Sequence, residues 1–555
     1  MSVPFRYRLA HQDSQLGVAY FSPEPADVMP LNQCLEHVRR LPNDEFMRAH
    51  VRPRLAALDE NELRGLFAAS KPAVQSLILE TTLLAPALRG LWAELASHAA
   101  ALADHGPQIF LGSASSPDHA THAAISRALA KNIFEHTPLP VALPALPDPG
   151  PGAAPSNPAQ LRANRPLLAP CPRRPAAETH AQAMERLYGL AILDGPEMRH
   201  HASLAPWGLL RRWRLDRTTR HGRVNFRLDG IMTSYGRGTT RDEARASLAM
   251  EIVERYSSFA DIRDGRVSGS GQGGELRVGR WSEMGTATLD PNSIRLEVPY
   301  RDQPLHWLEA TDRHGRPVFV PAQCVYLFTN LDEIRLFSGL GSTGLAAGNT
   351  PAEAKVSGLL EVIERDSEAV SPFDPARCFR VESRDAEMAA LLDSHRAQGV
   401  DHIFQDITSD LGVPCYKCFA HLANGGLVKA TGASLSGKRA AIAALTETPF
   451  PFPQGPASAP GPAELPTRVL EDLPDHGTGS AEGDLALLET ILEHHGYAPI
   501  YADLTKRELR LPVYRTLVPG LEIVADFDRF TRISPRIWRG VLTVKEKAAV
   551  QRPRG

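Results

Sequence analysis

Apolar residues recur at intervals of three and four positions through the first part of the chain. The segments that carry this pattern are 31–41, 60–70, 71–103 and 119–134, and the spacing predicts amphipathic helices. Several short helices of this kind are typical of a bundle. We therefore predict a mostly helical N-terminal domain over residues 1–137, in which no recognisable motif indicates a role.

Residues 138–168 break the pattern with a stretch rich in proline and alanine. Proline lacks a backbone N–H and disfavours helix, so we interpret this stretch as a linker or an extended arm. Beyond it we expect helices at 178–193, 438–446 and 484–494 and strands at 213–234, 318–329, 333–339, 414–419, 499–504 and 513–517. This mixture predicts an α/β or α+β domain over residues 169–545.

Composition and charge narrow the possible partners. The chain has 555 residues and a formal net charge of −3, so no global basic field would attract nucleic acid or an acidic membrane. The arginine-rich run 211–223 is a local exception, which we interpret as a solvated strand or loop. No stretch approaches the ~18 apolar residues of a membrane span, and the first residues lack the apolar core of a signal peptide. We expect a cytoplasmic protein.

The six cysteines are too scattered for a disulfide framework, which fits a reducing compartment. Only Cys415 and Cys418 lie close together in the sequence. Such a pair can be half of a zinc site, but no second pair or histidine partner with ligand spacing follows. We expect these two cysteines to pack within a strand.

The segment 348–367 has a second copy upstream, at 238–257, with a constant offset of 110 residues. The shared positions are Gly238/Gly348, Thr240/Thr350, Glu243/Glu353, Ala244/Ala354, Ser247/Ser357, Glu251/Glu361, Glu254/Glu364 and Arg255/Arg365. Many different sequences can form an amphipathic helix. The same acidic and basic positions in both copies therefore indicate internal duplication. Each copy follows a glycine-rich turn, which predicts duplicated helix-strand units.

Each predicted helix has an apolar face for the core and an acidic face. The acidic residues are Glu251 and Glu254 in the first helix, and Glu353, Glu361 and Glu364 in the second. A single acidic face usually meets water. If the two copies pack about a pseudo-twofold axis, however, the five carboxylates would converge and repel one another unless cations lie among them. Mg²⁺ is the natural cation for carboxylate and phosphate oxygens, and no P-loop motif is present.

The two helices resemble the paired signatures of the YcaO family. The first is similar to SxxxExxER over residues 247–255, and the second to NxxxE followed by ExxER over residues 349–365. The turn YGRGTT, and the segments 503–505 and 518–522, resemble further parts of the family pattern, so that the resemblance covers about residues 165–540. It implies a YcaO-type fold that binds ATP and Mg²⁺.

The resemblance also implies roles for the matching residues. Mg²⁺ would be held by Glu251, Glu254, Glu361 and Glu364, together with Glu353; ATP would be held by Ser247, Arg255, Asn349 and Arg365 and, on a looser alignment, by Arg174 and Thr179. Glu447 matches the third family signature, and Arg237 stands where the family has the lysine of a GKG turn. No residue can be named for proton transfer, so the catalytic residue is unknown.

Some departures from the family pattern bear on turnover. Arg237 keeps the charge of a lysine but changes its reach. Ala443 replaces the arginine of the third signature, with Arg439 as a candidate substitute. Azoline-forming members end in a PxPxP tail, whereas this sequence ends VQRPRG and carries PFPFP at 449–453, where we expect a loop. The missing tail favours thioamide formation or a methylthiotransferase-accessory role over azoline formation.

The implied activity is ATP-dependent O-phosphorylation of a peptide or protein backbone amide, giving a thioamide or an azoline or supporting protein methylthiolation. The expected partners are a peptide or protein substrate and a TfuA-like protein or sulfur donor, and the protein could form a homodimer. One alternative is a nucleotide-binding scaffold that presents a peptide to a partner enzyme. Another is ATP hydrolysis or ligase chemistry on a small acid, which would use the same metal site.

Overall fold

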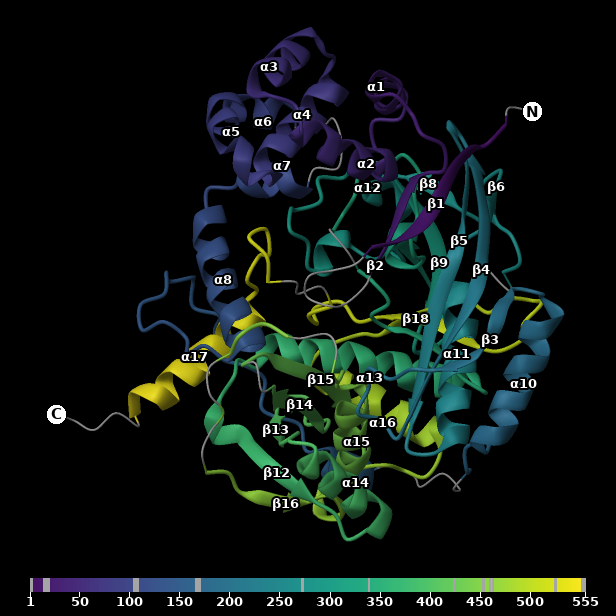
Figure 1. Cartoon of the computed structure of the whole chain (residues 1–555), viewed down its shortest axis with the longest axis vertical. Coiled ribbons are helices and arrows are strands. Elements are labelled where there is room, and N and C mark those ends of the chain that lie inside the picture. Colours follow the sequence, from purple (N-terminus) through teal and green to yellow (C-terminus); the bar gives the residue numbers. More distant parts are fainter. Residues whose placement is uncertain are drawn as a thin grey trace.

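The computed structural model describes residues 3–12, 20–102, 109–164, 171–270, 274–337, 340–422, 425–451, 455–458, 461, 464–523 and 527–550. Three sheets and the helices around them form the body of the molecule, with a helical region at one end (Figure 1). This mixture is the predicted α+β class. No helix in the described ranges is long and apolar enough to cross a membrane.

The helical region contains the predicted amphipathic helices. They are α1 (Leu31–Arg40), α2 (Glu45–Ala56), α3 (Glu60–Ala69), α4 (Pro72–Leu84), α5 (Arg89–Leu95), α6 (Ala99–Leu102), α7 (Ile109–Ala114) and α8 (His119–Glu135). Asp59 and Glu62 form a capping box that starts α3, as their spacing favours. Inside the region, a fully buried ion pair of 2.8 Å joins Arg48 to Glu80, so α2 is fixed against α4.

Two strands precede these helices, which the helical pattern did not predict. Strand β1 (Phe5–Gln12) pairs with β2 (Tyr20–Pro25) and runs parallel to β5 (Val224–Gly238). The first strands therefore share a sheet with a segment more than 200 residues later in the sequence. The division of the chain at residue 137 stays a prediction.

The first sheet has seven strands in the order β2-β1-β5-β4-β6-β7, with β3 beside β4. Its remaining strands are β3 (Leu193–Arg199), β4 (Trp207–His221), β6 (Ile262–Arg263) and β7 (Arg266–Val267), and helices α10 (Ala176–Gly189) and α11 (Arg241–Ser258) accompany it. The predicted pair of strands is the β4–β5 hairpin. The arginine-rich run lies on β4, as expected of a strand, although Arg217 is buried and donates to the carbonyls of Tyr256 and Phe259.

The other two sheets carry the rest of the body. The six-stranded sheet contains β8 (Arg277–Gly279), β9 (Leu305–Asp312), β10 (Pro317–Pro321), β11 (Leu345–Ala347), β17 (Ile500–Asp503) and β18 (Val513–Leu517). The five-stranded sheet contains β12 (Cys378–Glu382), β13 (His402–Asp406), β14 (Cys415–His421), β15 (Leu427–Ala433) and β16 (Thr467–Val469). The helices of this part are α12 (Trp281–Met284), α13 (Pro351–Val370), α14 (Ala386–Ala397), α15 (Gly437–Glu447), α16 (Ala481–His494) and α17 (Pro535–Val550).

Two local expectations on this part have clear outcomes. The strand expected at 333–339 is wrong for its described residues, because 333–337 lie outside helix and strand. Cys415 and Cys418 are buried and unpaired on β14, which confirms that they pack within a strand. Residues 449–451 of the PFPFP segment lie outside helix and strand, and residues 452–454 lie outside the described ranges.

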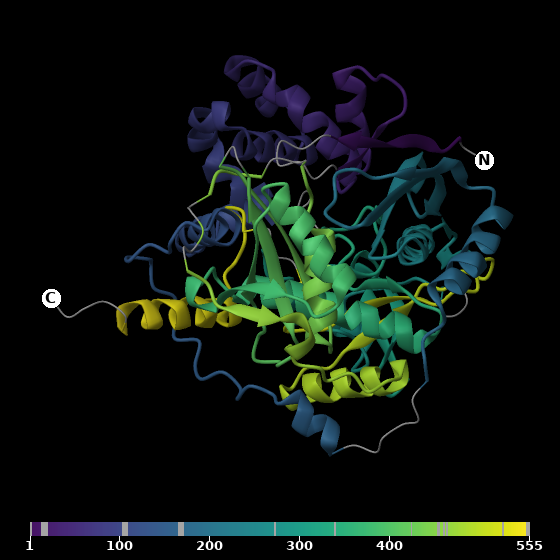
Figure 2. The same cartoon turned by 60° about the horizontal axis from the view of Figure 1, so that its bottom comes forward.

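The proline-rich stretch runs as an extended arm along α17. Leu139, Leu143 and Leu146 pack in one apolar cluster with Trp538 and Val541 of α17. The side chains of Arg539 and Lys545 donate to backbone carbonyls of the arm. The short helix α9 (Pro158–Ala163) then lies beside α16 (Figure 2), so the arm follows the surface of the body rather than spanning solvent.

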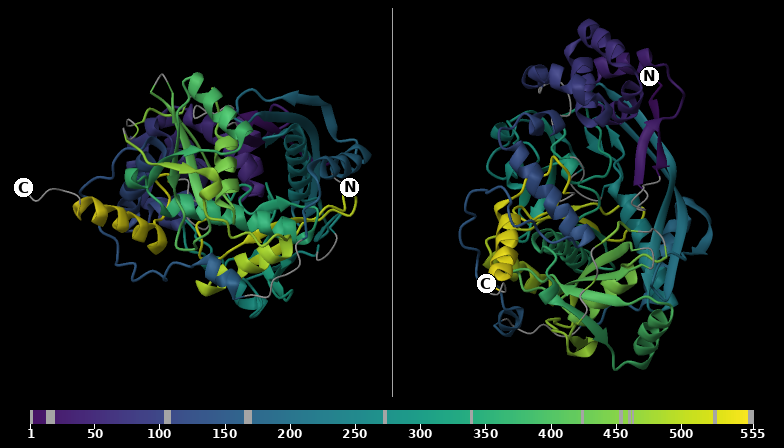
Figure 3. Two further views of the ribbon diagram at one scale, coloured as in Figure 1. Left: turned by 90° about the horizontal axis from the view of Figure 1, so that it is seen from below. Right: turned by 60° about the vertical axis from the view of Figure 1, so that its left-hand side comes forward.

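Helix α17 is tied to α13 by buried charges. Arg536 donates to Asp366 of α13 at 2.7 and 2.8 Å, and to Asp410 at 2.6 and 2.9 Å. Asp366 is fully buried. Figure 3 shows α8 and α17 side by side, where their apolar residues join the same cluster as the arm. The C-terminal helix thus holds both the arm and one of the two duplicated helices.

Candidate functional site

The two duplicated helices begin with the same local structure. Thr240 accepts a hydrogen bond from the N–H of Glu243 at the start of α11, and Thr350 accepts one from the N–H of Glu353 at the start of α13. The glycine two positions before each threonine packs against its helix, since a Cβ would lie 2.7 Å from the nitrogen of Ala244 in one copy and 2.4 Å from that of Ala354 in the other. The repeat of 110 residues is therefore a repeat of structure.

A third unit, which the sequence comparison missed, follows the same plan. Helix α15 begins after Ser436 at its N-cap position. A Cβ on Gly432 of β15 would lie 2.5 Å from the carbonyl oxygen of Ala440, and a Cβ on Gly236 of β5 would lie 2.2 Å from that of Ala244, eight residues further on in both cases. The signal in the sequence was a strand glycine followed by a Ser or Thr cap.

Each of the three helices carries a glutamate eleven residues after its cap residue. These are Glu251 after position 240, Glu361 after position 350, and Glu447 after position 436. Each helix also contacts the strand of another unit: α11 contacts β11, α13 contacts β15, and α15 contacts β5. Three units in a cyclic arrangement, rather than two about a twofold axis, bring the acidic positions together.

Burial raises the pKa of five carboxyls at this meeting point. The pKa is about 8 for Glu254 and about 7 for Glu364, and the pKa values of Glu251, Glu361 and Glu447 move in the same direction for the same reason. Repulsion adds to burial, because Glu361 raises the pKa of Glu254, and Glu447 raises that of Glu364. The carboxyls therefore repel one another when they are ionised, which favours a bound proton or a bound cation at this place.

Several of these carboxylates are oriented by hydrogen bonds from neighbouring strands. The N–H of Tyr235 on β5 donates to Glu251 at 3.3 Å, and the N–H of Gly344 donates to Glu361 at 3.0 Å. The hydroxyl of Thr431 on β15 donates to Glu364 at 2.6 Å. Two strands, β5 and β15, and the turn before β11 thus position the acidic groups on the two long helices.

Guanidinium groups lie among the carboxylates. The Nε of Arg255 is 3.8 Å from Glu251 and 3.6 Å from Glu254. Arg237 and Arg365 act electrostatically on Glu447 and lower its pKa against the effect of burial. Arg365 keeps contact with solvent, so its charge can meet an incoming anion. The predicted residues Arg237, Arg255, Arg365 and Glu447 are therefore brought together.

Arg515 is a member of this cluster that the sequence did not indicate. It is 1% exposed on β18 and donates to the carbonyls of Cys324 and Gly341, both at 3.1 Å. Its charge lowers the pKa values of Glu361 and Glu254 against burial. A lone arginine within an apolar strand pattern carries no motif, and its position became visible only once β18 was placed beside β11.

Glu353 lies apart from the other predicted metal ligands. Its Oε2 accepts hydrogen bonds from the backbone N–H and side-chain amide of Asn349 at 2.8 and 2.9 Å. Because it precedes Glu361 by eight residues on the same helix, it is displaced by about 12 Å along the axis. Glu353 therefore stabilises the start of α13, and its role as a Mg²⁺ ligand stays a prediction.

The remaining predicted residues occupy different positions around the cluster. Ser247 is exposed on α11, one turn before Glu251. Thr179 is buried on α10, which packs along α11. Arg174 is exposed and donates to Gln182. The roles of Ser247, Thr179 and Arg174 in holding nucleotide stay predictions.

A polar cavity of about 610 Å³ lies beside α13 and the beginning of α15. Arg173, Ser436 and Arg439 line it together with Val356 and Leu360 of α13. Arg439 lies two turns before Glu447 on α15. Asp475 and Asp484 line it as well, and Asp484 pairs with Arg173 at 3.8 Å. The cavity therefore carries charges of both signs, and Arg439 beside the N-terminus of α15 is the group in it that favours an anion.

The cluster fits Mg²⁺ and phosphate by the chemistry of its groups. Its donors are carboxylate oxygens, which a hard cation prefers, and Arg237 within it keeps a buried Nε without a hydrogen-bond partner. Among the described residues, no three acidic, histidine or cysteine side chains are arranged closely enough to ligate one ion by themselves. Magnesium commonly takes only one or two protein carboxylates and completes its shell with water and phosphate oxygens.

Comparison with known proteins gives a family match over this region. A sequence model described as YcaO cyclodehydratase, ATP- and Mg²⁺-binding, matches residues 235–449 and 452–522, which are more than half of the chain. An uncharacterized protein of Methanothermobacter thermautotrophicus is 31% identical over 335 residues, covering 53% of this chain and 83% of that protein. An uncharacterized protein in the tfuA 3′ region of Rhizobium leguminosarum bv. trifolii is 30% identical over 194 residues, covering 33% and 43%.

Solved structures share the fold. A heterocyclase in complex with substrate and cofactor superposes with a TM-score of 0.51 at 19% identity, covering 66% of this chain and 55% of that chain. A structure of YcaO from Methanopyrus kandleri bound with AMPPCP and Mg²⁺ gives a TM-score of 0.47 at 24% identity, covering 65% and 95%. The chain spans about half the length of the heterocyclase, and at 19% identity the likeness to it extends to the fold alone.

Proposed function

Since the chain belongs to the YcaO family, we propose that it uses ATP and Mg²⁺ to activate a backbone amide of a peptide or protein by O-phosphorylation. The observation that carries this proposal is the convergence of Glu251, Glu361 and Glu447 from three similar units. When these buried carboxyls are ionised they repel one another, which favours bound cations at this place. Bound Mg²⁺–ATP would supply those cations and the phosphoryl group that makes the amide oxygen a leaving group.

We propose two roles for the residues of the site. Glu251, Glu254, Glu361 and Glu364, with Glu353 nearby, are the proposed Mg²⁺ ligands; Ser247, Arg255, Asn349, Arg365, Arg174 and Thr179 are the proposed nucleotide contacts. Arg237 and Arg365 would face phosphate oxygens, where a planar guanidinium can donate two parallel hydrogen bonds. The charges of Arg237 and Arg365 also lower the pKa of Glu447 against the effect of burial, so that its carboxyl ionises more readily. These groups bind and orient; none is assigned to proton transfer.

The product depends on which nucleophile attacks the activated amide. Attack by a neighbouring Cys, Ser or Thr side chain at the amide carbon expels phosphate and gives an azoline, whereas attack by external sulfide expels phosphate and gives a thioamide. The relative encoded in a tfuA 3′ region supports a TfuA-like partner for this chain. We therefore favour the thioamide branch, in which such a partner delivers the sulfur.

One assay tests the proposal. The full chain is incubated with Mg²⁺–ATP, sulfide and candidate peptides, while phosphate release and peptide mass are followed. We expect peptide-stimulated phosphate release and a gain in peptide mass equal to the replacement of one oxygen atom by one sulfur atom. The proposal fails if Mg²⁺–ATP is neither bound nor consumed with any peptide, or if Glu361→Gln leaves both binding and turnover unchanged.

A nucleotide-binding scaffold is the second candidate. Ala443 favours it, because the family arginine is missing one turn before Glu447, on the same side of α15. A scaffold would bind Mg²⁺–ATP and a peptide without consuming ATP. Addition of a TfuA-like protein to the same assay separates the two, since an enzyme gains turnover with its sulfur donor, whereas a scaffold still releases no phosphate.

A further inference from the structure

A second cavity, of about 510 Å³, lies between the helical region and the body of the molecule. One wall is formed by residues of 323–337 together with Leu340 and Gly341, which precede α13. Another is formed by Asn43 and by Glu45, the first residue of α2. Its volume is within the range of ligand sites. We call it the apolar cavity, because its lining includes Tyr326, Leu327, Phe328, Leu331, Ile334 and Phe337.

The apolar cavity reaches the carboxylate cluster through Arg515. This side chain lines the cavity and donates to the carbonyl of Gly341, another lining residue. Three residues further on, the N–H of Gly344 donates to Glu361. Leu327 is also fixed to the end of α11, because its N–H donates to the carbonyl of Ser258 at 2.9 Å. One wall of the cavity is therefore bonded to both helices of the proposed site.

The polar groups around the cavity are largely occupied by one another. Gln323 donates to Glu333 at 2.9 Å and accepts from the N–H of Leu336 at 2.8 Å. Arg335 forms an ion pair with Glu45 at 2.9 Å, which also links this wall to α2. A ligand with its own charge would find few unpaired partners among these groups, so the cavity suits an uncharged, apolar group.

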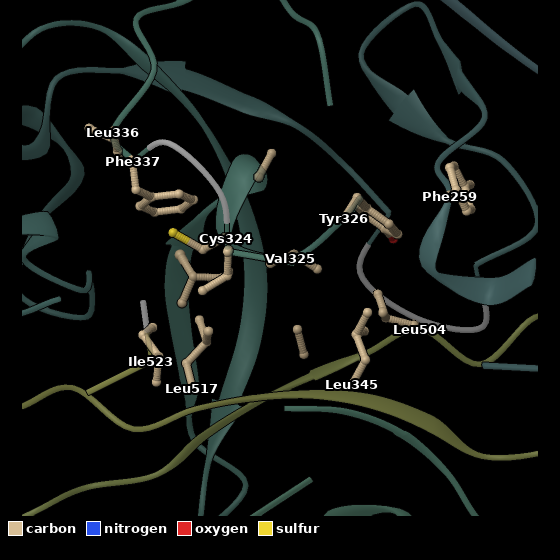
Figure 4. Packing of buried hydrophobic residues seen from close by; sticks show 14 of the residues in the cluster. Phe259, Cys324, Val325, Tyr326, Leu336, Phe337, Leu345, Leu504, Leu517 and Ile523 are labelled. Atoms are coloured by element: carbon tan, nitrogen blue, oxygen red, sulfur yellow. The ribbon is translucent and has the colours of Figure 1, made fainter. Parts of the chain in front are cut away.

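The backbone of this wall is held in an uncommon conformation. Phe328 has a φ of 51°, which is costly for a bulky residue and persists only where the surroundings fix it. Its ring stacks on Phe259 at 5.7 Å between centroids. Figure 4 shows the adjoining part of the wall, where Cys324, Tyr326 and Phe337 pack with Leu345 and Leu517. The wall is thus rigidly built on the core rather than a loose loop.

We propose that the apolar cavity binds an apolar side chain of the peptide substrate next to the amide that is activated at the carboxylate cluster. This inference rests on the proposed function and adds the substrate class, a peptide with an apolar residue beside the reacting amide. It also gives the helical region a role, because the beginning of α2 forms part of the wall. The polar cavity, which Val356 and Leu360 of α13 line, remains for the nucleotide.

The test uses two blocked, fluorescein-labelled hexapeptides, Gly-Ser-Leu-Gly-Ser-Gly and the same peptide with Asp in place of Leu. Their binding to the full chain is measured by fluorescence anisotropy in the presence of Mg²⁺ and a non-hydrolysable ATP analogue. We expect the Leu peptide to bind at least 10-fold more tightly than the Asp peptide. Ile334→Trp, which fills the cavity, should weaken binding of the Leu peptide at least 10-fold.

Val318→Trp is the matched control, because Val318 is also a partly buried residue on the same core and does not line the cavity. It should leave peptide binding unchanged. If Ile334→Trp does not fold, Thr329→Arg tests the same point from a half-buried lining position and should weaken the Leu peptide by a similar factor. Thermal melts of each variant establish that it is folded.

Three outcomes would overturn the inference: no binding of either peptide at concentrations up to about 1 mM, equal binding of both peptides, or loss of binding of the ATP analogue instead of the peptide in Ile334→Trp. The last would assign the cavity to the nucleotide base. Failure of the proposed function is distinct, because it appears as an absence of Mg²⁺–ATP binding by the unmodified chain, whatever happens to the peptides.

Discussion

The two long units, with α11 and α13, differ from the short unit with α15 in chemistry more than in construction. All three have a Ser or Thr cap and a glutamate eleven residues later. The long helices add a second glutamate and an arginine, whereas α15 ends at Glu447 and has Ala443 where the others have serine. The shared spacing from N-cap to glutamate therefore fixes the position of one carboxylate in each unit. The second glutamate and the arginine of the long helices then set the charge around that carboxylate.

Replacing the first glutamate of a long unit should have the largest effect. We expect Glu361→Gln to reduce ATP consumption by about 100-fold or more, because a neutral amide cannot offset the charge of a cation in a confined site. Steady-state phosphate release at varied Mg²⁺ measures it. Glu387→Gln, at an exposed position on α14, is the control and should be silent. Equal losses in both would indicate a general effect on folding.

The same substitution in the short unit sharpens the comparison. We expect Glu447→Gln to cost about 10-fold in turnover, less than Glu361→Gln, because no second glutamate follows it on α15. Phosphate release for the two variants and for their combination gives the coupling between the units. A loss as large as that of Glu361→Gln would mean that all three units contribute equally.

The strand glycines test the shared construction without touching the charges. Gly432→Ala places a methyl group 2.5 Å from the carbonyl oxygen of Ala440, and Gly236→Ala has the same effect on α11. Such overpacking of backbone should cost about 1–3 kcal/mol of the free energy of unfolding in each. Urea titration measures both. Gly65→Ala, where no atom lies within 4 Å, should not destabilise the protein.

The raised pKa values predict how stability depends on pH. Glu254 and Glu364 have pKa values of about 8 and 7 in the folded chain, above the ordinary value of 4.5, so the folded state binds protons more tightly than the unfolded one. Without metal, stability should decrease as pH rises from about 4.5 to 8. Thermal melts with EDTA and with Mg²⁺ check this, and Mg²⁺ should stabilise most at the alkaline end. An increase in stability with pH in EDTA would contradict the assignment.

The smallest expected effect is a gain. Ala443→Arg restores the family residue beside Glu447, and a cation there should tighten Mg²⁺–ATP binding by about 3- to 10-fold. Calorimetry measures the affinity, with Ala397→Arg at an exposed position of α14 as the control. No change at position 443 would indicate that Arg439 already fills this role.

The internal repeat predicted the site residues of the two long units, whereas Glu447 of the short unit was indicated only by the family resemblance and its structural likeness to the other two was not predicted. Residues such as Glu251 and Glu361 stood out because the helices around them repeat at a fixed offset. The short unit has in common only a glycine, an N-cap residue and a glutamate. These are too few matching residues to be distinguished from a chance similarity. Arg515 and the strand β1 depend on contacts between segments far apart in the sequence, which periodicity within a window cannot reveal.

The ion pairs between Arg536 and Asp366 also affect the order in which parts of the chain can fold. Asp366 lies two residues after Glu364 on α13, while Arg536 is made about 170 residues later. Domains fold as the chain emerges from its N-terminal side, so α13 is made well before the arginine that pairs with Asp366. Until α17 docks, this buried carboxylate keeps only its other partners, such as the N–H of Glu522, and we expect the end of α13 that carries Glu364 to be fixed late in folding.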